Sequence, residues 1–254
     1  MIYDILFPVL MSLIAGLATG LGGLMVYLFG KLEGKTLGFL MGFAGGVMIV
    51  VSFVELFVEA LELVNLYWVV LFFSVGSICM MGLDLLIPHI EFGQWEKGVT
   101  DKKLMRSGII IALGMSLHNL PEGLVVSAGF SHMPSLGILV TIMICLHNIP
   151  EGIATVTPLI SAGVDKRRAL GLATLSGLTE PLGALIGVAL IGLFGGDSMV
   201  IGASLAFASG VMTYITIDEL IPVAHDFCKP VYKHYVSAGV LCGVVLAQLL
   251  SVII

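Results

Sequence analysis

The sequence predicts an all-α polytopic membrane protein with eight transmembrane helices, and three observations support this fold class. Of the 254 residues, 58% are hydrophobic and only 11% are charged, whereas soluble domains carry roughly 25% charged residues. The mean hydropathy is +1.11, more apolar surface than a water-soluble core could bury. Eight apolar segments approach the ~20 residues that a helix needs to cross a bilayer.

Each expected span is one apolar run with polar or turn-forming residues at its ends. The eight spans are expected at about residues 4–30, 37–62, 66–88, 104–130, 135–162, 167–194, 198–224 and 232–254, within one membrane domain over residues 1–254. The first run is longer than a signal peptide and lacks a basic start and a cleavage site, so we expect a retained helix. The four cysteines show no paired spacing, which predicts no disulfide framework.

The basic residues predict the orientation of the spans. All 11 lysines and arginines lie in or beside the connections that follow spans one, three, five and seven. They are Lys31, Lys35, Lys97, Lys102, Lys103, Arg106, Lys166, Arg167, Arg168, Lys229 and Lys233. Because basic residues concentrate in cytoplasmic loops, these connections are expected in the cytoplasm and both chain termini outside.

Spans two and seven share a pattern. FAGGVM at 43–48 precedes Glu55, FASGVM at 207–212 precedes Glu219, and seven residues separate the methionine from the glutamate in both. Spans one and six share a glycine pattern as well. Because the matched spans cross in opposite directions, the sequence predicts an inverted repeat of helices 1–3 and 6–8 around a central 4–5 pair.

The most distinctive feature is a doubled motif inside spans four and five. HNLPEG at 118–123 recurs as HNIPEG at 147–152, 29 residues later. Residues four apart share one face of a helix, so each histidine and its glutamate point the same way. Each proline frees a backbone carbonyl, which needs a partner at membrane depth. Ionisable groups inside a membrane are costly and indicate function.

Two such helices packed antiparallel would bring matching polar groups to one place. The groups come from His118, Asn119, Glu122, His147, Asn148 and Glu151. Imidazole suits zinc, iron, copper and nickel, and carboxylate oxygen also suits manganese. Glu180 in span six adds a third carboxylate, with which a pair of bridged cations becomes conceivable. Met48 in span two could add a thioether ligand or could simply pack.

Other polar residues in or near the spans leave alternatives open. Glu55 could line an entrance and Glu219, with the adjacent Asp218, a cytoplasmic exit, or these acids could face an aqueous vestibule. His132 is expected to be solvated just beyond span four, and Asp84 to be capped or to reach the inner surface. A last group at the inner surface suits metal transfer, although loops often collect such residues: His89, Glu91, His225, Asp226 and Cys228.

With HN-x-PEG in adjacent spans and Glu180 in SGLTEPLGALIG, the chain resembles the ZIP (Zrt/Irt-like) family of divalent-metal transporters, in its short ZupT-like prokaryotic branch. The resemblance implies that the six motif residues and Glu180 line a binuclear site, that Glu151 bridges the metals, and that Met48 matches a span-two ligand. It also implies a homodimer in which spans one, four, five and six move against the rest. Some members have aspartate where this chain has Asn148, and that difference predicts an altered range of cations.

The combined expectation is a transporter rather than an enzyme, a multi-pass protein of the cell membrane. Its expected cargo is Zn²⁺, with Fe²⁺, Mn²⁺, Co²⁺ and Cd²⁺ as further candidates, and we expect no nucleic-acid partner. A metal-selective channel and a membrane metal receptor are alternatives. An intramembrane zinc metalloprotease is a weaker one, because such enzymes carry a glutamate directly after the first of two histidines, where this chain has asparagine.

Overall fold

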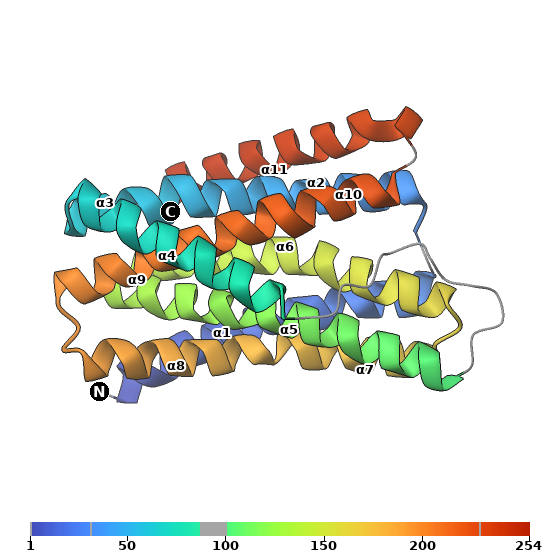
Figure 1. The fold of residues 1–254 in the computed structure, drawn as a ribbon, viewed down its shortest axis with the longest axis horizontal. Helices are drawn as coiled ribbons and strands as arrows, with labels where there is room; N and C mark the ends of the chain where they lie inside the picture. Colours follow the sequence, from blue (N-terminus) through green and yellow to red (C-terminus); the bar gives the residue numbers. More distant parts are fainter. Residues whose placement is uncertain (1, 31, 87–100, 229) are drawn as a thin grey trace.

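The chain is helical along almost all of the part that the computed structural model describes, residues 2–30, 32–86, 101–228 and 230–254 (Figure 1). Side chains are described except for those of residues 2–5 and 101–111. The helices are α1 (Ile2–Phe29), α2 (Gly34–Val50), α3 (Phe57–Leu63), α4 (Leu66–Asp84), α5 (Asp101–His132), α6 (Pro134–Ser161), α7 (Lys166–Gly177), α8 (Thr179–Leu193), α9 (Ser198–Ile215), α10 (Ile221–Phe227) and α11 (Lys233–Ile253). Three short segments join them, the π-helical η1 (Val51–Leu56) and η2 (Thr216–Leu220) and the 3-10 turn η3 (Pro230–Tyr232). These ranges contain no strand, which confirms the all-α prediction.

Seven stretches of the described residues are long and apolar enough to cross a membrane. Helix α5, with 32 residues, is also long enough and carries the first HN-x-PEG motif. A polytopic helical membrane protein is therefore confirmed. The expected bounds need correction at α4, which ends at Asp84 with residues 87–88 outside the described part, and at α5, which starts at Asp101.

The expected span 167–194 is divided at Leu178 into α7 and α8. Pro181 gives the physical reason, because it has no N–H to bond the carbonyl of Gly177 four residues earlier. The break places Glu180 in the first turn of α8. A residue predicted to lie in the middle of a helix therefore sits at an internal helix start.

Local capping explains several helix ends. The side chain of Asn65 accepts a hydrogen bond from the backbone at the start of α4, and Asp165 and Asp197 do the same for α7 and α9. These caps satisfy N–H groups that have no partner inside the helix. Gly30 follows α1 with a φ of +87°, a conformation that glycine adopts without steric cost.

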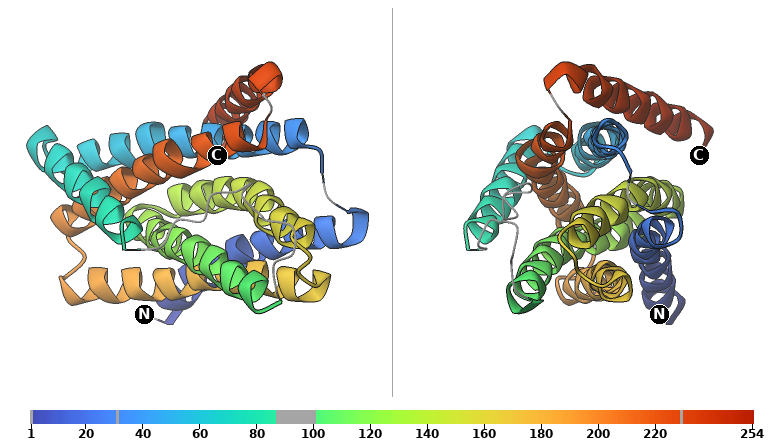
Figure 2. Two further views of the ribbon diagram at one scale, coloured as in Figure 1. Left: turned by 45° about the vertical axis from the view of Figure 1, so that its right-hand side comes forward. Right: turned by 90° about the vertical axis from the view of Figure 1, so that its right-hand side faces the viewer.

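The helices form two groups, which the end-on view of Figure 2 separates. One group holds α1, α5, α6, α7 and α8, with α1 against α6 and α5 against α8. The other holds α2–η1–α3, α4, α9–η2–α10 and α11, with α2 against α11 and α4 against α9. Contacts of α2 with α6 and of α9 with α5 join the groups. Both chain termini lie at the same end of the bundle (Figure 1).

Glycines allow the motif helices to approach their neighbours closely. A Cβ on Gly22 of α1 would lie 2.1 Å from the carbonyl oxygen of Ile149, and one on Gly183 of α8 would lie 2.0 Å from that of Leu120. Leu120 and Ile149 hold the same position in the two HN-x-PEG motifs. Each motif helix is thus packed backbone to backbone against one flanking helix.

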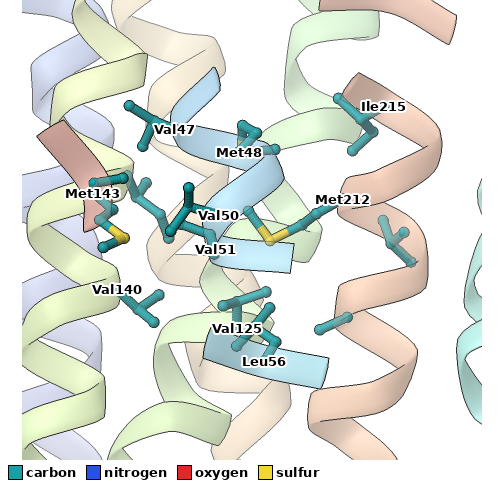
Figure 3. Close-up of a cluster of buried hydrophobic side chains, with 14 of the residues drawn as sticks. Val47, Met48, Val50, Val51, Leu56, Val125, Val140, Met143, Met212 and Ile215 are labelled. Carbon is teal, nitrogen blue, oxygen red and sulfur yellow. The ribbon is translucent and has the colours of Figure 1, made fainter. Parts of the chain in front are cut away.

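A cluster of buried apolar side chains fills the space between the two groups (Figure 3). It includes Met48 of α2, Val125 of α5, Met143 of α6 and Met212 of α9. Val125 and Met143 are each within about one helical turn of a motif residue. Apolar side chains from both helix groups therefore pack beside the polar motif residues.

The π-helical segments interrupt the two long helices of the second group. In η1 the N–H of Phe57 donates to the carbonyl of Ser52, and in η2 that of Ile221 donates to the carbonyl of Thr216. Both bonds span five residues instead of four. Single π turns of this kind occur frequently at functional sites.

Candidate metal site

The two motif helices bring their polar residues together inside the bundle. The Nε2 atom of His147 on α6 lies 3.0 Å from Oε1 of Glu122 on α5, and both side chains are fully buried. Ligand atoms of Glu122, His147 and Glu151 all lie within 4.8 Å of one another. This is a donor set of one imidazole nitrogen and two carboxylates, with the chemistry that zinc and similar cations prefer.

Both motif histidines are oriented by a backbone carbonyl at Nδ1. The Nδ1 atom of His147 lies 3.1 Å from the carbonyl oxygen of Met143, and that of His118 lies 2.9 Å from the carbonyl oxygen of Gly114. Because a carbonyl can only accept, Nδ1 donates in both. Nε2 is then the ring atom left to face a carboxylate, Glu122 for His147 and Glu219 for His118, and it can bind a metal ion when it carries no proton. Such carbonyl contacts orient metal-binding imidazoles.

Asn148 ties three helices together at the site. Its Nδ2 atom donates to the carbonyl oxygen of Ala15 on α1 at 2.9 Å and to Oε1 of Glu180 on α8 at 2.5 Å. These two donations orient the amide so that Oδ1 is the end without a protein partner. Glu180, the carboxylate expected from span six, therefore lies beside the second motif.

Several buried oxygen and nitrogen atoms of the site have no hydrogen-bond partner among the described residues. They are Nε2 of His118, which meets Glu219 at ion-pair distance without hydrogen-bond geometry, both side-chain amide atoms of Asn119, Oε2 of Glu122, Oδ1 of Asn148, both oxygens of Glu151 and Oε2 of Glu180. An unpaired buried carboxylate is costly by several kcal/mol. Divalent cations would satisfy this oxygen-rich set and neutralise its charge, so the donor set fits a metal ion as cargo.

The first motif also reaches into the other helix group. The Nε2 atom of His118 lies 2.9 Å from Oε1 of Glu219 in η2, whose side chain is 29% exposed. The sequence pattern placed Glu219 on an exit path and not against a motif histidine. The matched methionine-to-glutamate interval of spans two and seven singles out Glu219 but gives no signal of its partner.

Met48, the candidate thioether, is fully buried in the apolar cluster that also contains Val51 and Met212 (Figure 3). The same cluster contains Val125 of α5 and Met143 of α6, which are on the two motif helices. Packing accounts for this position, and its role as a ligand stays a prediction.

Glu55, Asp218 and Asp84 contact hydroxyl groups of neighbouring side chains. Glu55 in η1 is buried and accepts a hydrogen bond from the hydroxyl of Ser251 on α11. Asp218 is exposed, and the hydroxyl of Tyr214 lies 3.1 Å from Asp218 and from Asp84. Asp84 is buried, so it does not reach the inner surface, and its contact with Tyr214 is on the neighbouring helix α9.

His132 corrects a prediction. It was expected to be solvated beyond span four, but it ends α5 and its Nε2 lies 2.7 Å from Oε2 of Glu59 on α3, with only 14% of its side chain exposed. Helix α5 is longer than the apolar pattern indicated, so its last residue still packs against α3. The sequence gives no signal for this contact, because it joins positions 73 residues apart.

The residues predicted at the inner surface do not form a described cluster. His225 and Asp226 are exposed, whereas Cys228 is buried with its thiol 3.7 Å from the carbonyl oxygen of Gly34. Burial raises the pKa of Cys228, which disfavours the thiolate that binds metal. His89 and Glu91 lie outside the described residues. All four cysteines are free, as predicted.

Membrane-length helices around a buried cluster of histidine, asparagine and glutamate define a polytopic membrane protein with a candidate cation site among its helices. A family model described as "ZIP Zinc transporter" matches residues 94–251. The chain is 36% identical over 222 residues to the zinc transporter ZupT of Chlorobaculum parvum, covering 80% of this chain and 81% of that protein. It is also 36% identical to the zinc transporter ZupT of Oceanobacillus iheyensis over 216 residues, covering 78% and 79%.

The chain therefore belongs to the ZIP family of transporters. This membership confirms the resemblance carried by the two HN-x-PEG motifs. It also confirms the prediction of a transporter rather than an intramembrane protease.

Proposed function

We propose that the protein carries divalent transition-metal ions, zinc first among them, through the membrane into the cytoplasm. The observation that carries this proposal is the fully buried group of Glu122, His147 and Glu151, with ligand atoms within 4.8 Å of one another. Its oxygens lack other partners, and the family model and relatives are described as zinc transporters. Fe²⁺, Mn²⁺, Co²⁺ and Cd²⁺ share the coordination chemistry and are proposed as further cargo.

Flux into proteoliposomes tests the proposal. Purified full-length protein should import Zn²⁺ with saturable kinetics, because each ion occupies a defined set of ligands. Flux that rises linearly with concentration would replace the carrier by a channel. Binding without flux would replace it by a membrane metal receptor, the third reading of the sequence.

We propose that the site holds two ions. One would bind at His147, Glu122 and Glu151, and the other at Asn148 and Glu180, with Glu151 between them. Support comes from the number of unpaired buried oxygens at the site, which exceeds the four ligands that a zinc ion takes. Asn119, three residues before Glu122 in the first motif, would add an amide oxygen. Anomalous diffraction at a metal edge would count the ions.

We propose an internal inverted repeat as the frame of this site. Gly22 meets the motif carbonyl of Ile149 as Gly183 meets that of Leu120, and the two π-turn bonds lie 164 residues apart in the chain. The packing of α2 on α11 likewise parallels that of α9 on α4. These paired contacts support the predicted relation of helices 1–3 to helices 6–8.

We propose that the end of the bundle with the basic connections faces the cytoplasm. Both chain termini then lie outside. Single cysteines in a cysteine-free chain would test this orientation: Glu62→Cys should react with a membrane-impermeant thiol reagent in whole cells, and Lys35→Cys only after permeabilisation. The opposite pattern would reverse the transport direction.

A homodimer in the cell membrane also remains a proposal, supported by the family resemblance alone. Chemical cross-linking in native membranes would test it, because a dimer should give one discrete band at twice the mass of the chain.

A further inference from the structure

Glu55 and Glu219 occupy equivalent positions in the two π-helical segments. Glu219 follows Glu55 by 164 residues, and Leu220 follows Leu56 by the same interval. The closing bonds of the two π turns, from Phe57 and from Ile221, keep this interval too. The two carboxylates are therefore counterparts in backbone geometry as well as in sequence.

Their contacts are nevertheless different. Glu219 lies against Nε2 of the first-motif histidine, His118, at 2.9 Å. Glu55 is turned to α11, where the hydroxyl of Ser251 donates to it. The second-motif histidine, His147, has Glu122 at its Nε2 instead. The structure thus contains one histidine–glutamate contact between the helix groups at the site and lacks its counterpart.

The surrounding helices provide for the missing counterpart. Helix α2 packs against α6, as α9 packs against α5, and η1 itself contacts α6, the helix of His147. Proteins with inverted repeats change their access side by moving one group of helices against the other. In such a change each of the two repeats takes the arrangement that the other repeat had before.

We propose that Glu55 and Glu219 are alternating positioning residues. Glu219 holds His118 in the state described here, and Glu55 holds His147 in the state open to the opposite side, with Ser251 keeping Glu55 while it is disengaged. This inference rests on the inverted repeat of the proposed function. It adds that each access state has its own carboxylate at a motif histidine.

The π turns give a physical means for this exchange. A π turn contains one residue more than a regular turn, and moving it along a helix by one residue rotates the side chains it passes by about 100°. Glu55 and Glu219 lie within these segments. Their carboxylates can therefore turn towards or away from a motif histidine while the helix ends stay packed.

Cross-linking of cysteine pairs in the cysteine-free full-length chain tests the proposal. The pair Glu219→Cys with His118→Cys and the pair Glu55→Cys with His147→Cys should both be bridged by Hg²⁺ in membranes. The pair Glu59→Cys with His147→Cys, one turn further along the same helix, is the control and should not be bridged. Bridging of the first pair alone, of neither pair, or of the control to the same extent would overturn the proposal.

A second measurement leaves both His147 and Glu55 unaltered. Ser251→Ala frees Glu55, so it should shift the population to the opposite state and lower the bridging of Glu219→Cys with His118→Cys by about fivefold, the effect of losing one hydrogen bond. Ser74→Ala, which removes a hydroxyl bonded only to its own helix at Val70, is the matched control. Unchanged bridging in Ser251→Ala would overturn the proposal.

Zinc flux of the unaltered protein is measured separately. Both pairs bridged without any flux would overturn the proposed transport and leave the exchange of Glu55 and Glu219 standing. Saturable flux with only the Glu219 pair bridged would do the reverse.

Discussion

Gly16 on α1 and Gly177 at the end of α7 lie backbone against backbone, each occupying the place where the other would carry a side chain. A Cβ on Gly16 would be 2.1 Å from the carbonyl oxygen of Gly177, and a Cβ on Gly177 would be 2.1 Å from that of Gly16. A Cβ on Gly16 would also approach Cβ of Glu180 to 3.5 Å. This reciprocal contact sets how close α1 comes to the start of α8, and with it the position of the Glu180 carboxylate.

Replacing Gly177 by alanine should therefore destabilise the protein. The added methyl group cannot fit beside a backbone carbonyl, so α1 and α7 must separate, at a cost of about 1–3 kcal/mol in the free energy of unfolding. Thermal unfolding of the purified protein in detergent measures this loss. Gly171→Ala on the same helix is the control, because a Cβ there meets nothing within 4 Å. Equal melting temperatures for the two variants would contradict the packing argument.

Glu151→Gln should reduce zinc uptake by at least about tenfold while the protein stays folded. Glutamine keeps the size of the side chain but removes the charge and one strong ligand oxygen, and even groups that only support metal ligands change affinity by about 10–100-fold. Flux into proteoliposomes and thermal unfolding measure the two effects. Glu62→Gln, at an exposed position, should transport normally. Normal uptake by Glu151→Gln would refute the ligand assignment.

Asn148→Asp should change the order of metal preference. Aspartate cannot donate to the Ala15 carbonyl or to Glu180, so it would place a second carboxylate where an amide donor now sits. The metal-free protein should unfold at a lower temperature, and bound metal should raise that temperature more than in the unaltered protein.

Competition among Zn²⁺, Fe²⁺, Mn²⁺ and Cd²⁺ in the flux assay measures the preference. Asn65→Asp is the control, since Asn65 caps α4 by accepting a hydrogen bond, which aspartate also does. The same order of metals in Asn148→Asp and the unaltered protein would count against Asn148 as a ligand.

Glu180→Gln should lower the number of bound metal ions from two to one. Glutamine can still accept the hydrogen bond from Asn148, so the helix start should keep its shape while the third carboxylate loses its charge. Metal content of the purified protein after equilibrium dialysis measures the change. The Glu122, His147 and Glu151 group would retain its ion. Two ions in both proteins would refute Glu180 as a ligand of the second ion, and one ion in the unaltered protein would refute a binuclear site.

The sequence by itself determined that this is a membrane protein, because that property depends on local composition. Long apolar runs and the position of the basic residues are readable without any contact between helices. The doubled motif likewise predicts a shared face for each histidine and its glutamate, since residues four apart lie on one face of a helix. That spacing predicts which side chains of one motif point the same way, and it stops short of the meeting of Glu122 on α5 with His147 on α6.

Only the tertiary structure decided which of these groups meet. The contact of His118 with Glu219 joins residues on different helices, and the shared hold of Asn148 on Ala15 and Glu180 involves three helices. The π turns around Glu55 and Glu219 were also not predicted from the sequence, because the apolar pattern runs through both spans without a break. Spacing along a helix fixes what a side chain can reach on its own face, whereas the partner across an interface depends on how closely glycine backbones let the helices approach.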